Sequence, residues 1–277
     1  LLPQPVMDVL VKIQLGFGYL PEFDIAFGAA KPTGLLNAIE GTFSIKDVAF
    51  RGLEVESLRG KVSRRNGRLD LTELAGTVSG QEERSVETGS GMVGGSATGA
   101  CFWDAGEKTF GVSASGSLEP ALLIRPLDMV KVATNVLHRF RFVDQPPQVS
   151  LELGSSLVDW KQFYINVHGR ANGGYVHGAR FSSVNASAYY YGAVLRLDPV
   201  AAMQGADFLK GSASLDFRRK TATFDGFGSL NPETIEDLAY DGFNLFGHKI
   251  IAGGDTQIKA QGTVDWKTMQ ATDFKAE

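Results

Sequence analysis

A diverged internal repeat constrains the fold of this chain more than any other feature of its sequence. The pattern Gly-Ser-Leu-x-Pro begins at Gly116 and again at Gly228, an offset of 112 residues (228 minus 116). Gly-Ser-Ala occurs upstream at 95–97 and 211–213, and Val-Asp-Trp-Lys occurs downstream at 158–161 and 264–267, at offsets of 116 and 106. Three matches in one order indicate a structural unit of roughly a hundred residues.

Between the repeated phrases, apolar and polar residues alternate with the period of a β-strand. The clearest alternation falls at 110–114, 149–153 and 258–261. A change of phase in the segment 43–50 predicts a bulge at Lys46-Asp47. Asn66-Gly67 predicts a tight hairpin, and Asn172-Gly173-Gly174 predicts a second turn. The 33 glycines suit many turns between many short strands.

Proline-led segments between these strands predict short helices. Asn231 is a good N-cap, and Pro232 suits the first position of a helix over 232–240. Segment 120–139 carries an apolar stripe at helical spacing, and segment 5–13 resembles the same helix one unit earlier. The polar, glycine-rich stretch 80–95 predicts a flexible loop.

The sequence therefore predicts a mainly β fold with a few short helices. We expect an elongated antiparallel β-meander, either a curled sheet forming a groove or a sandwich, with diverged internal repeats. The expected units are residues 1–118, 119–230 and the start of a third at 231–277, in one continuous structure. Periodicity alone leaves open whether the apolar side lines an open groove or forms a filled core.

Bulk properties exclude several classes of protein. A net charge of -4 gives no general attraction to nucleic acid or to anionic membranes. The single cysteine, Cys101, cannot form an intrachain disulfide, and beside Phe102 and Trp103 in an expected strand it reads as a small core residue. No apolar stretch reaches the length of a membrane-spanning helix, and no signal peptide is recognisable. The abrupt ends suggest a piece of a longer protein.

Three short phrases carry a resemblance to a known family: Arg68-Leu69-Asp70-Leu71, then 95–99 (Gly-Ser-Ala-Thr-Gly) and 115–118 (Ser-Gly-Ser-Leu). Together with the meander and its helices, they resemble the AsmA-like family, the bacterial relatives of TamB and of repeating β-groove proteins. The resemblance implies a half-open groove with an apolar lining and a non-catalytic role in lipid handling or outer-membrane assembly. It also implies a periplasmic location in the cell envelope, a membrane anchor outside this sequence, and lipid or membrane partners.

Two residue sets are the candidate sites. Arg64, Arg65 and Arg68 lie with Arg59 and Lys61 around the Asn66-Gly67 turn, and such a basic hairpin suits phosphates of DNA or anionic lipid, or is a solvated tip. Asp198, Asp216 and Asp225 lie near expected strand ends, where two carboxylates can converge as in a hydrolase.

The remaining motifs have structural interpretations. Gly89-x-Gly91-x-x-Gly94 matches a dinucleotide fingerprint but follows a polar run instead of a strand. The histidines have no metal-binding spacing, although His168 and His177 flank the expected second turn and can face each other across it. Tyr189-Tyr190-Tyr191 is expected to divide between two faces of a strand. No cofactor or metal site is predicted, and the oligomeric state is left open.

The sequence thus supports three functions. The first is an AsmA-like, non-catalytic envelope module that handles lipid or assists outer-membrane assembly. The alternatives are a carboxylate-dependent peptidase or glycosidase, and a binding module that uses the basic hairpin.

Overall fold

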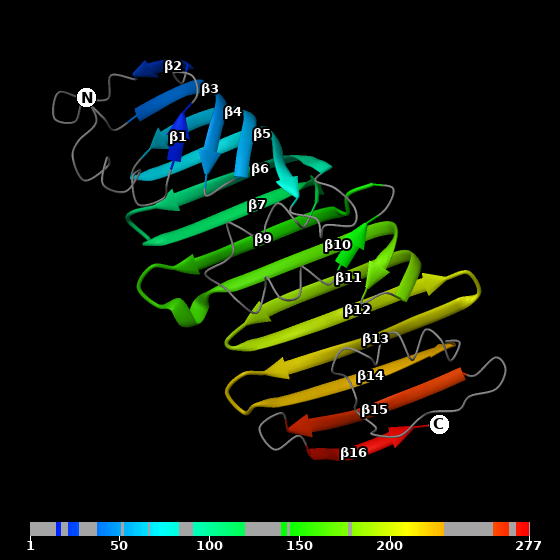
Figure 1. Cartoon of the computed structure of the whole chain (residues 1–277). Helices are drawn as coiled ribbons and strands as arrows, with labels where there is room; N and C mark the ends of the chain where they lie inside the picture. Colours follow the sequence, from blue (N-terminus) through cyan, green and yellow to red (C-terminus); the bar gives the residue numbers. More distant parts are fainter. Residues whose placement is uncertain are drawn as a thin grey trace. The chain divides into compact units, whose positions relative to one another are not determined.

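The structure, a computed structural model, describes eleven segments of the chain, namely residues 15–17, 22–27, 38–50, 53–65, 67–82, 91–119, 140–142, 145–176, 179–229, 257–265 and 270–276. They are almost entirely antiparallel β-strand, which confirms the predicted fold class (Figure 1). The chain divides into two compact units. Unit 1 comprises Leu1–His138 and Gly154–Val158, and unit 2 comprises Arg139–Leu153 and Asp159–Glu277. The three-part division drawn from the repeat stays a prediction.

Unit 1 is a meander in which long strands pair with their neighbours in the chain. In order these are β3 (Ala38–Phe50), β4 (Leu53–Arg65), β5 (Arg68–Glu82), β6 (Gly91–Asp104) and β7 (Thr109–Leu118). Two short strands, β1 (Leu15–Phe17) and β2 (Glu22–Phe27), pair with opposite ends of β3.

Unit 2 follows the same plan. Its strands are β8 (Phe140–Phe142), most of β9 (Gln148–Ser156), β10 (Tyr164–Val176), β11 (Ala179–Tyr191), β12 (Val194–Gln204), β13 (Asp207–Asp216), β14 (Thr221–Ser229), β15 (Gln257–Asp265) and β16 (Gln270–Ala276). From β10 onward each strand pairs with the next, and β8 pairs with the end of β10. A single turn of 3-10 helix, η1 (Trp160–Gln162), is the one helix among the described residues.

The predicted alternation is confirmed in the strands that carry it. In β9 the side chains of Val149, Leu151 and Leu153 are half-buried, whereas those of Ser150 and Glu152 are exposed. The alternating segments at 110–114 and 258–261 lie in β7 and β15. Since successive residues of a strand point to opposite sides, each unit acquires one polar and one apolar face.

One hairpin prediction is confirmed and the other is wrong. Arg65 pairs with Arg68 around the Asn66-Gly67 turn, and Gly67 has the positive φ (+84°) that such a turn requires. Asn172-Gly173-Gly174 is instead part of β10, where Asn172 pairs with Ser183 and Gly174 with Phe181. The strand continues to Val176, which pairs with Ala179. His177 lies outside the described residues, so the expected placing of His168 and His177 across a turn stays a prediction.

The irregularity predicted at Lys46-Asp47 is present, in a different form. Asp47 has a φ of +50°, but Lys46 still pairs with Ser57 and Val48 with Val55, so β3 gains no extra residue against β4. The extra residue lies in β4, where the register against β5 shifts between Val55 and Ser57. The backbone change at Asp47 accounts for the change of phase in the sequence.

The first halves of the two units are equivalent at an offset of 126 residues. Strands β3 and β10 each span 13 residues and begin 126 apart (164 minus 38), as do β4 and β11 (179 minus 53). Asp47 and Gly173 (φ +74°) are equivalent positions with positive φ, as are Gly67 and Ala193 (φ +69°). The short strands β1 and β8 pair with matching ends of β3 and β10.

The second halves are equivalent at the offset of 112 that the sequence showed. Asp104 pairs with Thr109 and Asp216 with Thr221 around four-residue loops, and Gly116 and Gly228 face Ala97 and Leu209. A Cβ atom on Gly116 or Gly228 would collide with the backbone oxygen of the facing strand, Ser96 or Phe208. The strands approach so closely at both positions that only glycine fits without moving the backbone.

The other two repeated phrases are less exact markers. Register equates Gly99, not Gly95, with Gly211, because Leu74 pairs with Gly99 and its equivalent Val200 pairs with Gly211. Val158 follows the end of β9, whereas Val264 lies within β15, and residues 266 and 267 lie outside the described segments.

The loop predicted over 80–95 is strand at both of its ends, since β5 runs to Glu82 and β6 starts at Gly91. The helices predicted at 5–13, 120–139 and 232–240 lie outside the described residues, as does the middle of that loop.

Candidate functional site

A cleft of about 1000 Å³ lies on the polar face of unit 1. Two cross-strand rows form it. Asp24 pairs with Thr42 and Thr42 with Lys61, and Glu22 pairs with Ser44 and Ser44 with Arg59. The full lining is Glu22, Asp24, Thr42, Phe43, Ser44, Arg59, Gly60, Lys61, Glu73, Leu74, Ala75, Thr98 and Gly99.

A bulge in β5 supplies the far side of this cleft. The register between β4 and β5 jumps from Lys61–Thr72 to Arg59–Ala75, which leaves Glu73 unpaired with a φ of +52°. Glu73 Oε1 accepts a hydrogen bond from Lys61 Nζ at 2.5 Å, and both side chains are more than half exposed. The bulge thus directs a carboxylate into the polar cleft.

Charge is divided across the cleft. The carboxylates of β2 stand on one side, the cations of β4 on the other, and the hydroxyls of Thr42 and Ser44 lie between them. Strands β2 and β4 are two strand spacings apart, or about 10 Å. Lys61 is paired with Glu73, whereas Arg59 makes no ion pair within the described segments, and neither do Glu22 and Asp24.

The basic cluster predicted at the first hairpin is largely neutralised. Arg65 Nη2 lies 3.1 Å from Glu40 Oε2, and Arg68 Nε lies 2.9 Å from Asp70 Oδ1. The guanidinium of Arg68 also stacks 4.2 Å from the centre of the Phe102 ring. Arg64 is exposed and points to the other side of the sheet from Arg65. A phosphate approaching this hairpin meets carboxylates beside two of its three arginines.

The apolar faces form continuous rows. In unit 1 the face (the unit 1 apolar face) comprises Phe43, Ile45, Leu58, Val62, Leu71, Leu74, Cys101 and Val112. In unit 2 one row crosses six strands through Ile165, Tyr190, Leu195, Leu215, Ala222 and Val264, and a parallel row runs through Val167, Ala188, Leu197, Ala213 and Phe224. All of these side chains are half-buried, and no large side chain of the described residues is fully buried.

The three consecutive tyrosines divide between the faces as expected. Tyr190 lies on the apolar face of unit 2 between two rings, with centroids 6.2 Å from both Phe163 and Phe217. Tyr189 and Tyr191 lie on the polar face and are 43% and 48% exposed.

Burial and the nearby Glu152 carboxylate raise the pKa of Tyr164, which pairs directly with Tyr191.

The three candidate aspartates lie apart on the polar face of unit 2. Asp225 pairs with Ser212 on one side of β13, and Asp198 lies on the other side, in the irregular stretch of β12 between Leu197 and Val200, so the two are about two strand spacings or 10 Å apart. Asp216 lies four residues farther along β13, or about 13 Å from Ser212. This spacing gives no paired acid and base among the three, so the hydrolase alternative gains no support from them.

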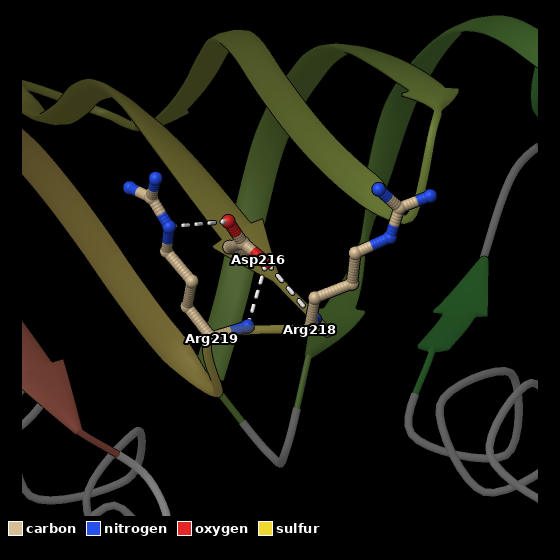
Figure 2. Close-up of polar contacts among 3 residues, drawn as sticks. All are labelled: Asp216, Arg218 and Arg219. Carbon is tan, nitrogen blue, oxygen red and sulfur yellow. Dashed lines mark hydrogen bonds and ion pairs between the residues drawn. The ribbon is translucent and has the colours of Figure 1, made fainter.

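Asp216 has a structural role in its hairpin loop (Figure 2). Its Oδ1 accepts hydrogen bonds from the backbone N–H groups of Arg218 and Arg219, both at 2.9 Å, and its Oδ2 lies 3.8 Å from Arg219 Nε. The backbone hydrogen bond from Arg219 is the main reason that the pKa of Asp216 lies below its usual value. The equivalent Asp104 accepts a matching bond from Glu107.

Other sequence motifs also take structural places. Burial, and then the charge of Asp70, raise the pKa of the half-buried Cys101 thiol, so the thiol is held in its less reactive form. Gly91 and Gly94 lie within β6, where no strand-to-helix turn exists for a pyrophosphate, and residue 89 lies outside the described segments. His168 Nδ1 shares a hydrogen bond of 2.9 Å with Ser187 Oγ across β10 and β11.

The cleft was not predicted from the sequence. Its members are isolated acidic, basic and hydroxyl residues in five strands, and only the register brings Glu22 near Arg59. The one available signal was Lys61 and Arg59 two apart in an alternating strand, interpreted as part of the basic hairpin.

Within the segments that the structure describes, no group of three or more histidine, cysteine or acidic side chains is arranged to hold a metal ion. The same segments contain no helix of the length and apolarity that a membrane span needs. Comparisons of this chain with protein-family models, with curated proteins and with solved structures found no match.

Proposed function

We propose that this chain is a lipid-handling module of the AsmA-like type in a bacterial cell envelope, with no catalytic role of its own. The apolar face of each unit carries the proposal. In unit 2 its side chains form uninterrupted rows across the strands, and in both units they are only half-buried. The phrase Gly116-Ser117-Leu118, which resembles that family, ends β7, and its repeat begins with Gly228-Ser229 at the end of β14.

A half-exposed apolar row suits an acyl chain. Each square ångström of apolar surface removed from water is worth about 25 cal/mol, and an extended chain covers many such side chains at once. A row across a sheet needs no directional partner, so it accepts different lipids. The half-exposed Tyr190, Leu195 and Leu215 of unit 2 have this character.

The proposal is tested by mass spectrometry of the protein under native conditions and by displacement of a fluorescent fatty acid. Val112→Asp places a carboxylate on the unit 1 apolar face, and Ser113→Asp places the same group on the polar face one residue away. We expect Val112→Asp to fold, by circular dichroism, and to bind the probe at least about tenfold more weakly, whereas Ser113→Asp binds as the parent does.

Two results would contradict the proposal. One is an absence of co-purified lipid together with no binding of the probe. The other is unfolding of Val112→Asp alone, which would identify the apolar face as a filled core.

A further inference from the structure

We propose that the cleft of unit 1 binds a short linear zwitterion with the dimensions of a dipeptide or tripeptide. The ammonium end lies at Glu22 and Asp24, and the carboxylate end lies at Arg59. Its charged and hydroxyl side chains point away from the unit 1 apolar face, so peptide binding here can be tested separately from the proposed lipid binding.

The separation of charge in the cleft selects such a ligand. Glu22, Asp24 and Glu73 contribute three negative charges, and Arg59 and Lys61 contribute two positive charges. Only Lys61 and Glu73 neutralise each other. What remains is two carboxylates on β2 and one guanidinium on β4. A simple anion would meet two uncompensated carboxylates, and a simple cation would leave Arg59 without a partner.

The size of the cleft sets the length of the ligand. Its two charged sides rise from backbones about 10 Å apart, and extended peptide spans about 3.3–3.6 Å for each residue. A chain of two or three residues therefore bridges the sides. The volume of about 1000 Å³ accommodates it with its hydration water.

The floor and end groups supply the hydrogen bonds that peptide atoms require. Thr42 and Ser44 form the floor between the charged sides. Thr98 lies beyond Arg59, in the cross-strand row that continues from Arg59 through Ala75. Hydroxyls both donate and accept, so they serve amide N–H and C=O groups alike. A guanidinium binds a carboxylate through two parallel hydrogen bonds, which favours the peptide carboxylate over a neutral amide.

Calorimetric titration with Ala-Ala and Ala-Ala-Ala tests the site, using the same peptides with an acetylated amino end or an amidated carboxyl end as probes. We expect each blocked peptide to bind about tenfold more weakly than the free one, because each loses one charge-assisted contact. Arg59→Gln is expected to abolish discrimination against the amide, and Glu22→Gln to weaken discrimination against the acetylated peptide.

Matched variants separate the cleft from general charge effects. Arg64→Gln removes the same charge from β4 on the other side of the sheet, and Glu54→Gln removes an exposed carboxylate outside the cleft lining. Both are expected to bind as the parent does. The proposal is overturned if no free peptide binds at millimolar concentration, if blocked peptides bind as tightly as free ones, or if Arg64→Gln matches Arg59→Gln. Loss of lipid binding with peptide binding intact would leave this site standing.

Discussion

Two equivalent hairpin positions in the two units have the same backbone conformation, although they hold different residue types. Gly67 and Ala193 are equivalent second residues of two-residue hairpin loops, and both have a positive φ. The first accepts a hydrogen bond at its oxygen from Ala105 N, and the second accepts one from Phe217 N. The equivalent bonds require the same loop geometry, although only one of the loops has glycine at that position.

Exchanging the residue types at these two positions is expected to have opposite effects. Ala193→Gly relieves the strain of a left-handed alanine and should raise the free energy of unfolding by about 0.5–1 kcal/mol. Gly67→Ala introduces that strain and should lower it by about 1 kcal/mol. Urea denaturation measures both. Gly169→Ala, where an added Cβ meets nothing within 4 Å, is the control for the general effect of replacing glycine. A loss of stability in Ala193→Gly would contradict the interpretation.

The same residues explain what sequence patterns reveal. The Asn66-Gly67 hairpin was predictable because glycine there reports a positive φ. Asn172-Gly173-Gly174 gives the same signal, but Gly173 uses its positive φ inside a strand, at the position that Asp47 occupies in unit 1. Local residue type thus reports backbone conformation and does not by itself distinguish a turn from an irregular strand.

At the scale of the element, the hairpin of β13 and β14 depends on one carboxylate. Asp216 Oδ1 holds two loop N–H groups, and these bonds favour the ionised carboxylate (Figure 2). A carboxyl group with a lower pKa in the folded chain binds fewer protons there than in the unfolded chain. Its contribution to stability is therefore present above its ordinary pKa and is lost as the pH falls through the lowered value.

Asp216→Ala is accordingly expected to lower the urea midpoint at neutral pH, and its deficit should disappear in strongly acidic solution. Hydrogen exchange of the Arg218 and Arg219 amides should accelerate in the variant at neutral pH. Asp225→Ala, in the exposed part of β14, serves as the control and should leave those amides unchanged. A deficit in Asp216→Ala that stays constant down to the lowest pH would contradict this role.

Element-scale pairing also explains why the fold was more predictable than the candidate site. The alternation of apolar and polar residues and the repeated glycine phrases are local features. The mainly β fold and the offset of 112 could therefore be found in the sequence. The offset of 126 was missed because its equivalent residues, such as Asp47 and Gly173, share conformation but not type. The cleft depends on the register of five strands and on the bulge at Glu73, and no local pattern specifies either one.

At the scale of the whole molecule, the repeat predicts that a substitution that destabilises one strand destabilises only the unit that contains it. Gly99 and Gly211 are equivalent positions in β6 and β13, each facing a close backbone. A Cβ on Gly211 would lie 2.6 Å from the oxygen of Asp225, and one on Gly99 would collide with the oxygen of Ser113. Either alanine variant should therefore force neighbouring strands apart, at a cost of about 1–3 kcal/mol.

Hydrogen exchange detected by mass spectrometry can locate that damage. In repeat architectures each element is stabilised mainly by its neighbours, so openings are local. Gly211→Ala should accelerate exchange in β13 and β14 and leave β3, β4 and β5 as in the parent, and Gly99→Ala should accelerate exchange in β6 and β7 and leave β11 and β12 unchanged. If both variants accelerate exchange equally in both units, the chain unfolds as one cooperative block. The repeat then does not divide its stability between the two units.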